Sequence, residues 1–156
     1  MTTADPGNPT NAASQPAKDP PLLLMVDDNP DDCFLLSRAL QKGVPGLRMV
    51  CLHDCDHAIA YLSGTAPFDD RVKHPLPRVV VIDIDLRGKS GLELLVWIRK
   101  HPALKDLPAV VLSQSLWATD RKTADLVGAS AYYSKPSDFD ELVATAKDIG
   151  KRCLPL

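Results

Sequence analysis

The sequence predicts an α/β protein in which a doubly wound parallel sheet of five strands is flanked by five helices. From residue 22 onward, short apolar runs of strand length alternate with amphipathic helical patterns, which is typical of parallel βα units. Because crossovers between parallel strands are right-handed, successive units wind over both faces of one sheet. The 156 residues, 45% hydrophobic and 24% charged, suit a single domain with its own core.

Each unit pairs an apolar strand with a helix that carries an inward stripe. Strands are expected at residues 22–26, 47–51, 78–83, 108–113 and 130–134. Helices are expected at about 30–42, 55–63, 91–100 and 120–127, and in a last segment whose apolar face is Phe139, Leu142, Val143, Ala146 and Ile149. Pro30 suits a first helical turn, and Gly43, Gly64 and Gly128 end three of the helices.

The remaining composition limits the class of protein. Residues 1–21 hold five prolines and no apolar periodicity, which predicts a disordered tail before a domain at 22–152 and a C-terminal tail at 153–156. Apolar runs fall short of the roughly 20 residues that span a bilayer, and no secretory signal is present. With a net charge of −2 and no basic cluster, we expect a cytoplasmic protein that binds neither membrane nor nucleic acid.

The cysteines lie in or beside periodic segments, so we expect reduced thiols rather than a disulfide framework; they are Cys33, Cys51, Cys55 and Cys153. A zinc site is the alternative, since four possible ligands alternate in one stretch: Cys51, His53, Cys55 and His57. That stretch straddles a strand end and a helix start. The four side chains would not share a face, and we therefore favour a structure without zinc there.

Reactive groups follow four of the predicted strands. Asp83 ends the apolar run 79–82, Asp27 and Asp28 follow the first strand, and Ser113 and Lys135 end the fourth and fifth. In doubly wound sheets, ligands bind beyond the carboxyl ends of the strands, where the winding reverses. We therefore expect these five side chains to form one site.

Three carboxylates at this edge repel one another. At separations near 5 Å and an effective dielectric constant near 20, each pair costs about 3 kcal/mol, which corresponds to roughly two pKa units. Either one Asp stays protonated or a cation lies among them, and oxygen ligands favour Mg²⁺. A carboxylate beside Mg²⁺ can attack a phosphoryl group in line, with Lys135 neutralising charge and Ser113 donating a hydrogen bond.

Four sequence blocks resemble the receiver domain of two-component response regulators over residues 22–150: MVDDNPDD, VVVIDIDLRGKSGLELL, AVVLS and GASAYYSKP. The resemblance implies a flavodoxin-like fold and a signalling domain that catalyses only its own phosphotransfer and dephosphorylation. It also implies individual roles: Asp83 as phosphate acceptor and metal ligand, Asp28 as a direct Mg²⁺ ligand, Asp27 as a ligand through water, Asp85 as a ligand through its backbone carbonyl, Lys135 as the phosphate contact, and Ser113 and Tyr132 as switch residues.

The NPDD turn, the AIAYLSG helix end and the long loop before the third strand look similar to stand-alone receivers paired with bacterial phytochrome histidine kinases. The partners implied are a sensor histidine kinase, a downstream protein and a second copy of the chain. Only residues 151–156 follow the last helix, so no attached output domain is expected. Tyr133, next to Tyr132, is expected to face the other side of the sheet.

Two positions depart from the family pattern. Arg87 stands where the family often has Pro, and Asp85 stands where close relatives often carry Asn. Asp85 and Ser115 occupy positions that in the family influence attack by water, so the lifetime of the phosphoryl group is left open.

Two other functions are weighed against this interpretation. The segment 82–86, with Ser113 and Lys135 after it, also resembles the haloacid dehalogenase phosphatases, but those enzymes place their Asp-x-Asp motif near the first strand and a metal-binding acidic pair after the lysine. Here the acidic pair, Asp27 and Asp28, comes first. The other alternative is an interaction module that works without phosphorylation, and the full acidic set argues against it.

Overall fold

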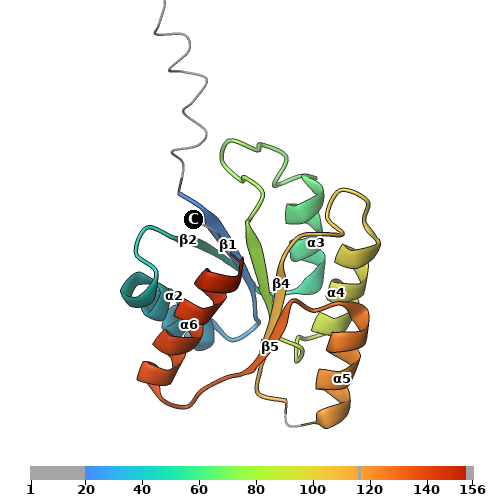
Figure 1. Ribbon diagram of the computed structural model, residues 1–156. Coiled ribbons are helices and arrows are strands. Elements are labelled where there is room, and N and C mark those ends of the chain that lie inside the picture. Colours follow the sequence, from blue (N-terminus) through green and yellow to red (C-terminus); the bar gives the residue numbers. More distant parts are fainter. Residues whose placement is uncertain (1–19, 116, 154–156) are drawn as a thin grey trace, which may run out of the picture.

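The computed structural model describes residues 20–115 and 117–153, and within them it confirms the α/β prediction (Figure 1). The strands are β1 (Leu22–Val26), β2 (Arg48–Leu52), β3 (Val79–Ile82), β4 (Ala109–Ser113) and β5 (Ala131–Ser134). The helices are α2 (Pro30–Gly43), α3 (Cys55–Ser63), α4 (Gly91–Lys100), α5 (Ala118–Val127) and α6 (Phe139–Cys153). All pairings are parallel, and the strand order is β2-β1-β3-β4-β5.

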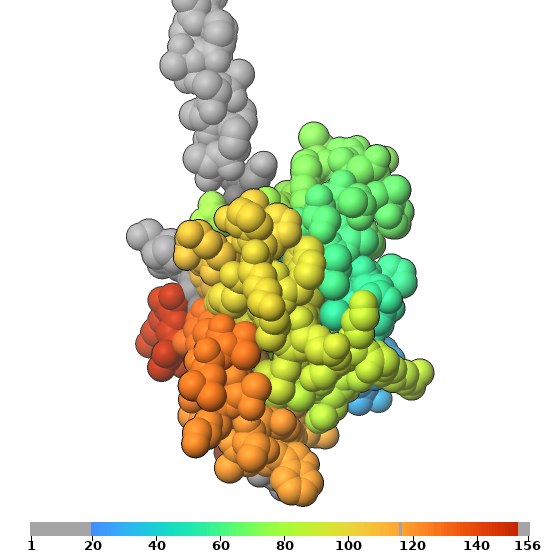
Figure 2. All heavy atoms as spheres, turned by 90° about the vertical axis from the view of Figure 1, so that its right-hand side faces the viewer, coloured from blue at the N-terminus to red at the C-terminus, as the bar shows by residue number. Residues whose placement is uncertain are grey.

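Helices cover both faces of the sheet. Helices α2 and α6 lie together on one face, and α3, α4 and α5 cover the other, where Figure 2 shows them as one continuous surface. Successive strand residues face opposite sides, so Leu24 of β1 joins the core under α3–α5 while Leu23 and Met25 join the core under α2 and α6. This double burial explains why the central strands are apolar throughout.

The winding reverses between β1 and β3, which are neighbours although β2 lies between them in the sequence. Their carboxyl ends are the point at which a doubly wound sheet forms its ligand site. Two helix starts shape this edge. The side chain of Asn29 caps α2 by accepting hydrogen bonds from the amides of Asp31 and Asp32, and Ser90 forms a capping box with Glu93 at the start of α4.

Element bounds differ from the expected ones by one or two residues. The observed β3, β4 and β5 are shorter than expected, β2 is shifted by one residue, and α5 begins two residues early. Pairing with neighbouring strands decides where a strand stops, and the local sequence does not contain that information. Helix α6 continues through Cys153, which the sequence assigned to the C-terminal tail. Of the two predicted tails, residues 1–19 and 154–156 lie outside the described residues.

The prediction of reduced cysteines is wrong for one pair. A disulfide joins Cys33, in the first turn of α2, to Cys51 of β2, while Cys55 is a buried free thiol. The packing of α2 explains the pairing: Cys51 lies opposite Met25 in the β1–β2 register, and both face the core that α2 covers. The two cysteines lie 18 positions apart in the sequence, and only this tertiary contact brings them together.

None of the helices in the described ranges is long and apolar enough to cross a bilayer.

Candidate functional site

The predicted site residues gather at the carboxyl edge of the sheet. Asp27 and Asp28 follow β1, Asp83 follows β3, Ser113 ends β4, and Lys135 follows β5. Asp27 and Ser113 are fully buried and Asp83 is 4% exposed. Burial of this many polar groups requires that each be paired.

Lys135 pairs with three carboxylates at once. Its Nζ lies 2.7 Å from Oδ2 of Asp27, 2.7 Å from Oδ2 of Asp32 and 2.8 Å from Oδ2 of Asp83. Burial by itself lowers the pKa of this ammonium, but the hydrogen bonds to Asp27, Asp32 and Asp83 outweigh burial and hold the pKa above its ordinary value. The ammonium is therefore a fixed countercharge for the acidic edge.

Both carboxylate oxygens of Asp83 accept hydrogen bonds. Oδ1 accepts from the Ser113 hydroxyl and from the Asp85 amide, each at 3.0 Å, and Oδ2 accepts from Lys135. The Lys135 amide in turn donates to the Ser113 carbonyl at 2.9 Å, which ties β5 to β4 at this point. The orientation of the Asp83 carboxylate is thus set by groups from three strand ends.

Asp27 and Asp28 complete the acidic edge. Burial raises the pKa of Asp27, although the hydrogen bond from Lys135 opposes that effect. Asp28 is more open, with 22% of its side chain exposed, and Nε of Arg87 lies 3.6 Å from its Oδ2. Arg87, which stands where the family often has Pro, therefore adds a cation beside Asp28, on a side chain that is 91% exposed.

The donor set fits a hard divalent cation. Carboxylate oxygens of Asp27, Asp28 and Asp83 lie within 4.8 Å of one another. An oxygen-only set with few carboxylates is the arrangement that Mg²⁺ accepts, because this ion keeps several of its waters. The three residues predicted as metal ligands through side chains or water are thus brought together.

Asp85 lies at the open side of the site. Its amide donates to Asp83, while its own side chain is exposed. Partial burial raises the pKa of Asp85, and the nearby charges of Asp83 and Asp120 raise it further. Ser115 lies opposite, where its amide donates to the Ser113 hydroxyl and its own hydroxyl donates to Asp120.

Tyr132 and Tyr133 point to opposite sides of β5, as expected. Tyr132 packs against the core under α3–α5, and the guanidinium carbon of Arg121 lies 5.5 Å from its ring centroid. Its hydroxyl is buried and makes no hydrogen bond of normal geometry within the described part of the chain, although the Ser115 side chain lies near it. Tyr133 packs on the α2 and α6 side and donates to Asp148.

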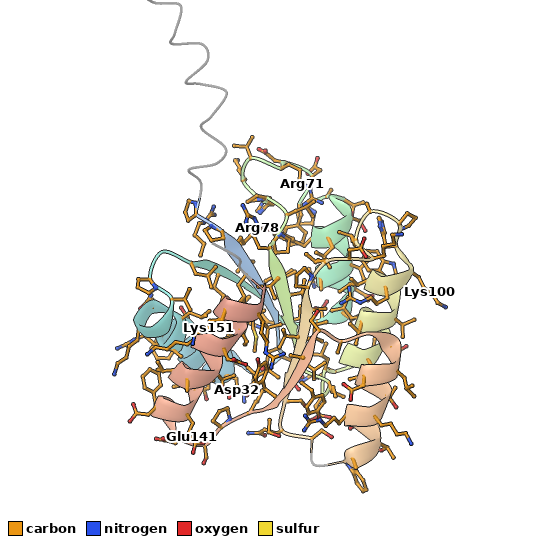
Figure 3. The ribbon with its side chains drawn as sticks, in the orientation of Figure 1. Asp32, Arg71, Arg78, Lys100, Glu141 and Lys151 are labelled. Atoms are coloured by element: carbon orange, nitrogen blue, oxygen red, sulfur yellow. A yellow bond between two sulfur atoms is a disulfide. The ribbon has the colours of Figure 1, made fainter. Side chains whose placement is uncertain are left out.

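The sequence interpretation missed two residues of the site. Asp32 enters from the first turn of α2 (Figure 3). It follows no strand directly, and its Oδ2 accepts a hydrogen bond from Lys135. The pair Asp31 and Asp32 in the NPDD turn could have indicated this contact. With Asn29 as the N-cap of a helix, Asp32 lies one helical turn after Asp28 and so close to the same edge of the sheet. Gly91 was missed too: a Cβ there would overlap the Asp83 carbonyl oxygen, so no larger residue fits behind Asp83.

The four ligands considered for zinc do not converge. Cys51 faces the core under α2 and α6, whereas Cys55 faces the core under α3–α5. The Nδ1 of His57 lies 2.6 Å from Asp54 at the start of α3. The four side chains do not share a face because the stretch runs from the end of β2 to the start of α3, as the sequence predicts.

Comparison with known families gives one match that covers most of the chain. The family model for the response regulator receiver domain matches residues 23–147. A relative from Methanothrix harundinacea, named "probable methanogenesis regulatory protein FilR2", is 32% identical over 134 residues, which are 85% of this chain and 83% of that protein. Response regulator Rcp1 of Synechocystis sp. is 26% identical over 136 residues, 87% of this chain and 90% of Rcp1.

Solved structures with the same fold include a phosphorylated response regulator and a metal-bound one. The phosphorylated cyanobacterial phytochrome response regulator RcpA superimposes with a TM-score of 0.79 at 27% identity, covering 86% of this chain and 94% of RcpA. The Mn²⁺-bound form of Rcp1 superimposes with a TM-score of 0.77 at 25% identity, covering 88% of this chain and 97% of Rcp1.

Proposed function

Since this chain belongs to the response regulator receiver domain family, we propose that its Asp83 accepts a phosphoryl group from a sensor histidine kinase and thereby switches the protein's conformation. One observation carries the proposal: Asp83 is held by Ser113 and the Asp85 amide on one oxygen and by Lys135 on the other. A carboxylate oriented by fixed donors in a nearly dry site is prepared for in-line attack.

In the proposed reaction, a carboxylate oxygen of Asp83 attacks the phosphorus of a phosphohistidine. The new O–P bond forms as the N–P bond breaks, and the bonding electrons return to the imidazole nitrogen. Lys135 supplies positive charge next to the transferred group, and the Ser113 hydroxyl is within reach to donate to one of its oxygens. When bound by Asp28 and Asp83, by Asp27 through water and by the Asp85 carbonyl, Mg²⁺ would neutralise charge on the phosphoryl oxygens.

The switch follows from the double role of Ser113. Its hydroxyl now donates to Asp83, so a new phosphoryl oxygen would compete for that hydrogen bond and draw Ser113 with it. The buried Tyr132 hydroxyl makes no hydrogen bond of normal geometry where it lies, which lowers the cost of another rotamer. Together these residues would reshape the face formed by α5, β5 and α6. To shift the protein from almost entirely inactive to almost entirely active, the phosphoryl group must favour the active conformation by about 5.5 kcal/mol. Charge-assisted hydrogen bonds to the phosphoryl oxygens can supply this free energy.

The partners are proposed from relatives and from the family. RcpA is a cyanobacterial phytochrome response regulator, and this similarity supports a bacterial phytochrome as the kinase here. We also propose that a downstream protein binds the phosphorylated face. The chain would form a homodimer and act in the cytoplasm. The family is a signalling family, and the only catalysis proposed is transfer and loss of the protein's own phosphoryl group.

Acetyl phosphate tests this proposal and separates it from the alternatives. The protein is incubated with Mg²⁺ and acetyl phosphate, and intact mass is followed for the wild type, Asp83→Asn and the control Asp56→Asn, whose carboxylate pairs with Lys89 on the surface. We expect one phosphoryl adduct in the wild type and the control and none in Asp83→Asn. Repeated turnover of varied phosphoesters would instead indicate a phosphatase. Failure to form an adduct, even with a cognate kinase, would contradict the proposal and favour an interaction module.

A further inference from the structure

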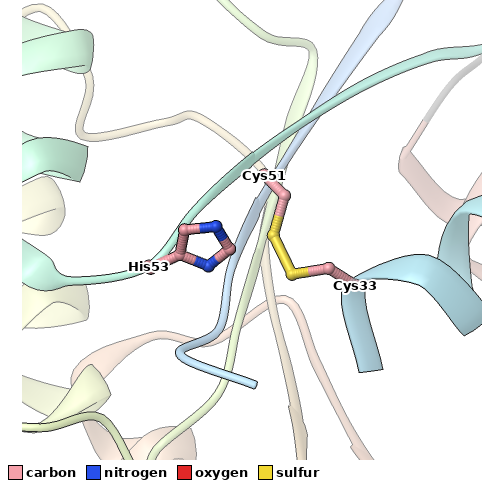
Figure 4. Close-up of side chains that lie close together, drawn as sticks. All are labelled: Cys33, Cys51 and His53. Carbon is pink, nitrogen blue, oxygen red and sulfur yellow. A yellow bond between two sulfur atoms is a disulfide. The ribbon is translucent and has the colours of Figure 1, made fainter. Parts of the chain in front are cut away.

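Two sulfurs and an imidazole converge beside the phosphorylation site, on residues that the proposed function does not use. Cys33 lies in the first turn of α2, Cys51 near the end of β2, and His53 just after β2 (Figure 4). Their possible ligand atoms, two sulfurs and a ring nitrogen, lie within 4.8 Å of one another. Cys33 is buried, Cys51 is half-buried and His53 is exposed, so the cluster opens to solvent at the imidazole.

The imidazole is oriented by the main chain. Nδ1 of His53 lies 3.0 Å from the backbone carbonyl oxygen of Asp27, and because a carbonyl only accepts, Nδ1 is the protonated nitrogen. Nε2 then keeps its lone pair. Histidines that bind metals characteristically donate their other ring nitrogen to a carbonyl or carboxylate in this way, which fixes the tautomer.

The structure records one oxidation state of this cluster, the Cys33–Cys51 disulfide, with a Cα–Cα distance of 6.4 Å. In a reducing cytosol the same positions carry two thiols. Two thiolates and one imidazole form the three-ligand set of soft and borderline donors that zinc prefers, and the exposed side leaves a fourth position for water. This set differs from the one rejected from sequence, because Cys33 comes from α2 and not from the residues around β2.

We propose that reduced Cys33 and Cys51, together with Nε2 of His53, bind a thiophilic divalent metal such as Zn²⁺, and that disulfide formation releases it. In the release step the two thiolates pass two electrons to a disulfide oxidant such as glutathione disulfide. One S–S bond forms in the protein and one breaks in the oxidant, whose two thiolates take up protons from water. The metal leaves without changing its own oxidation state. None of its three ligands is a residue that the proposed phosphoryl transfer uses.

Cobalt tests the proposal directly, because Co²⁺ replaces zinc and reports thiolate ligation by a charge-transfer absorption. The full chain is reduced and titrated with Co²⁺. We expect one equivalent of Co²⁺ to bind and to give the thiolate band, and Zn²⁺ to displace the Co²⁺. Prior oxidation with glutathione disulfide should abolish the band and should remove two titratable thiols from the protein. Asp83→Asn should keep the band, since its carboxylate is no part of this site.

Matched variants identify the ligands. Cys51→Ser and His53→Ala should each weaken Co²⁺ binding by at least about tenfold, whereas Cys55→Ser and His57→Ala should bind as the wild type does. Cys33→Ser, at a buried position, is a second test of the thiol pair, with circular dichroism to check folding. Absence of the band in the reduced wild type would overturn the proposal. So would a band that depends on Cys55, or an affinity for Co²⁺ that the loss of His53 leaves unchanged.

Discussion

Lys135 donates to Asp83 across 2.8 Å between Nζ and Oδ2, and this contact joins the end of β5 to the end of β3. The same nitrogen contacts Asp27 and Asp32, and only 9% of the lysine side chain is exposed. A single buried cation thus contacts three carboxylates, and its one positive charge offsets only part of theirs. The repulsion that the sequence predicts between strand-end acids is reduced within the chain, and the lysine already lies where a phosphoryl group on Asp83 would need a countercharge.

Lys135→Met tests this balance by keeping the length of the side chain and removing its charge. Leaving buried carboxylates without their partner should lower the free energy of unfolding by on the order of 3 kcal/mol, and Mg²⁺ should restore part of the loss. Urea unfolding with and without Mg²⁺ measures both effects. Lys122→Met on the exposed surface of α5 is the control. If the two variants lose equal stability, Lys135 is not the countercharge.

Gly91→Ala tests how tightly Asp83 is seated. The new Cβ would overlap the Asp83 carbonyl oxygen, a backbone atom that moves only if the strand end moves. We expect a stability loss of about 1–3 kcal/mol and slower phosphorylation of Asp83 by acetyl phosphate. Gly88→Ala controls for glycine flexibility, because Gly88 has φ of +79° and a methyl group added there would meet no atom within 4 Å. Gly88→Ala should lower the stability but leave the rate of phosphorylation unchanged. Equal phosphorylation rates in the two variants would contradict the role of crowding at Gly91.

Ser113→Ala separates phosphorylation from switching. The variant keeps Lys135 and the Asp85 amide on Asp83, so an adduct should still form. It lacks the hydroxyl that would follow the phosphoryl group, so the change in amide hydrogen exchange across β5 and α5 on phosphorylation should shrink. Mass spectrometry reads the adduct and the exchange in one sample. Ser63→Ala, at the exposed end of α3, should behave as the wild type does. An unchanged exchange response in Ser113→Ala would remove Ser113 from the switch.

Asp54 gives a prediction about pH. Its side chain caps α3 by accepting from the His57 amide at 2.7 Å, and this hydrogen bond lowers the pKa of Asp54 below its ordinary value of 3.8. The folded pKa is the lower one, so the charged cap stabilises the protein fully above pH 3.8, and this stabilisation is lost as the pH falls through the folded pKa.

Asp54→Ala should therefore lose about 0.5–2 kcal/mol at neutral pH. Asp54→Asn, which can still cap the helix, should lose less. The difference in stability between the wild type and Asp54→Asn should fade below pH 3.8. Thermal unfolding across the acid range measures this difference. A difference that grows towards low pH would contradict a lowered pKa for Asp54 in the folded protein.

The fold and most of the site were predictable because parallel strands carry local signals. A continuous apolar run identifies a strand buried on both faces, and the residue after the run must lie at the carboxyl edge. Asp27, Asp28, Asp83, Ser113 and Lys135 could all be placed by that reasoning. It works because the position of each residue depends on its own strand and not on a distant partner.

What the sequence did not reveal depends on packing between elements. Asp32 reaches Lys135 only because α2 begins close to the end of β5. Cys33 meets Cys51 because α2 lies across β2 and β1, and no spacing rule encodes that approach. The crowding at Gly91 likewise arises where the start of α4 passes behind Asp83.

Five acidic residues lie close together at this edge, and we propose that Asp83 alone carries the phosphoryl group. The protein is phosphorylated with acetyl phosphate and Mg²⁺, the acyl phosphate is trapped with hydroxylamine, and peptide mass mapping locates the resulting hydroxamate. We expect the modification at Asp83 alone. A hydroxamate at Asp27, Asp28, Asp32 or Asp85 in its place, or none at any of them, would contradict it.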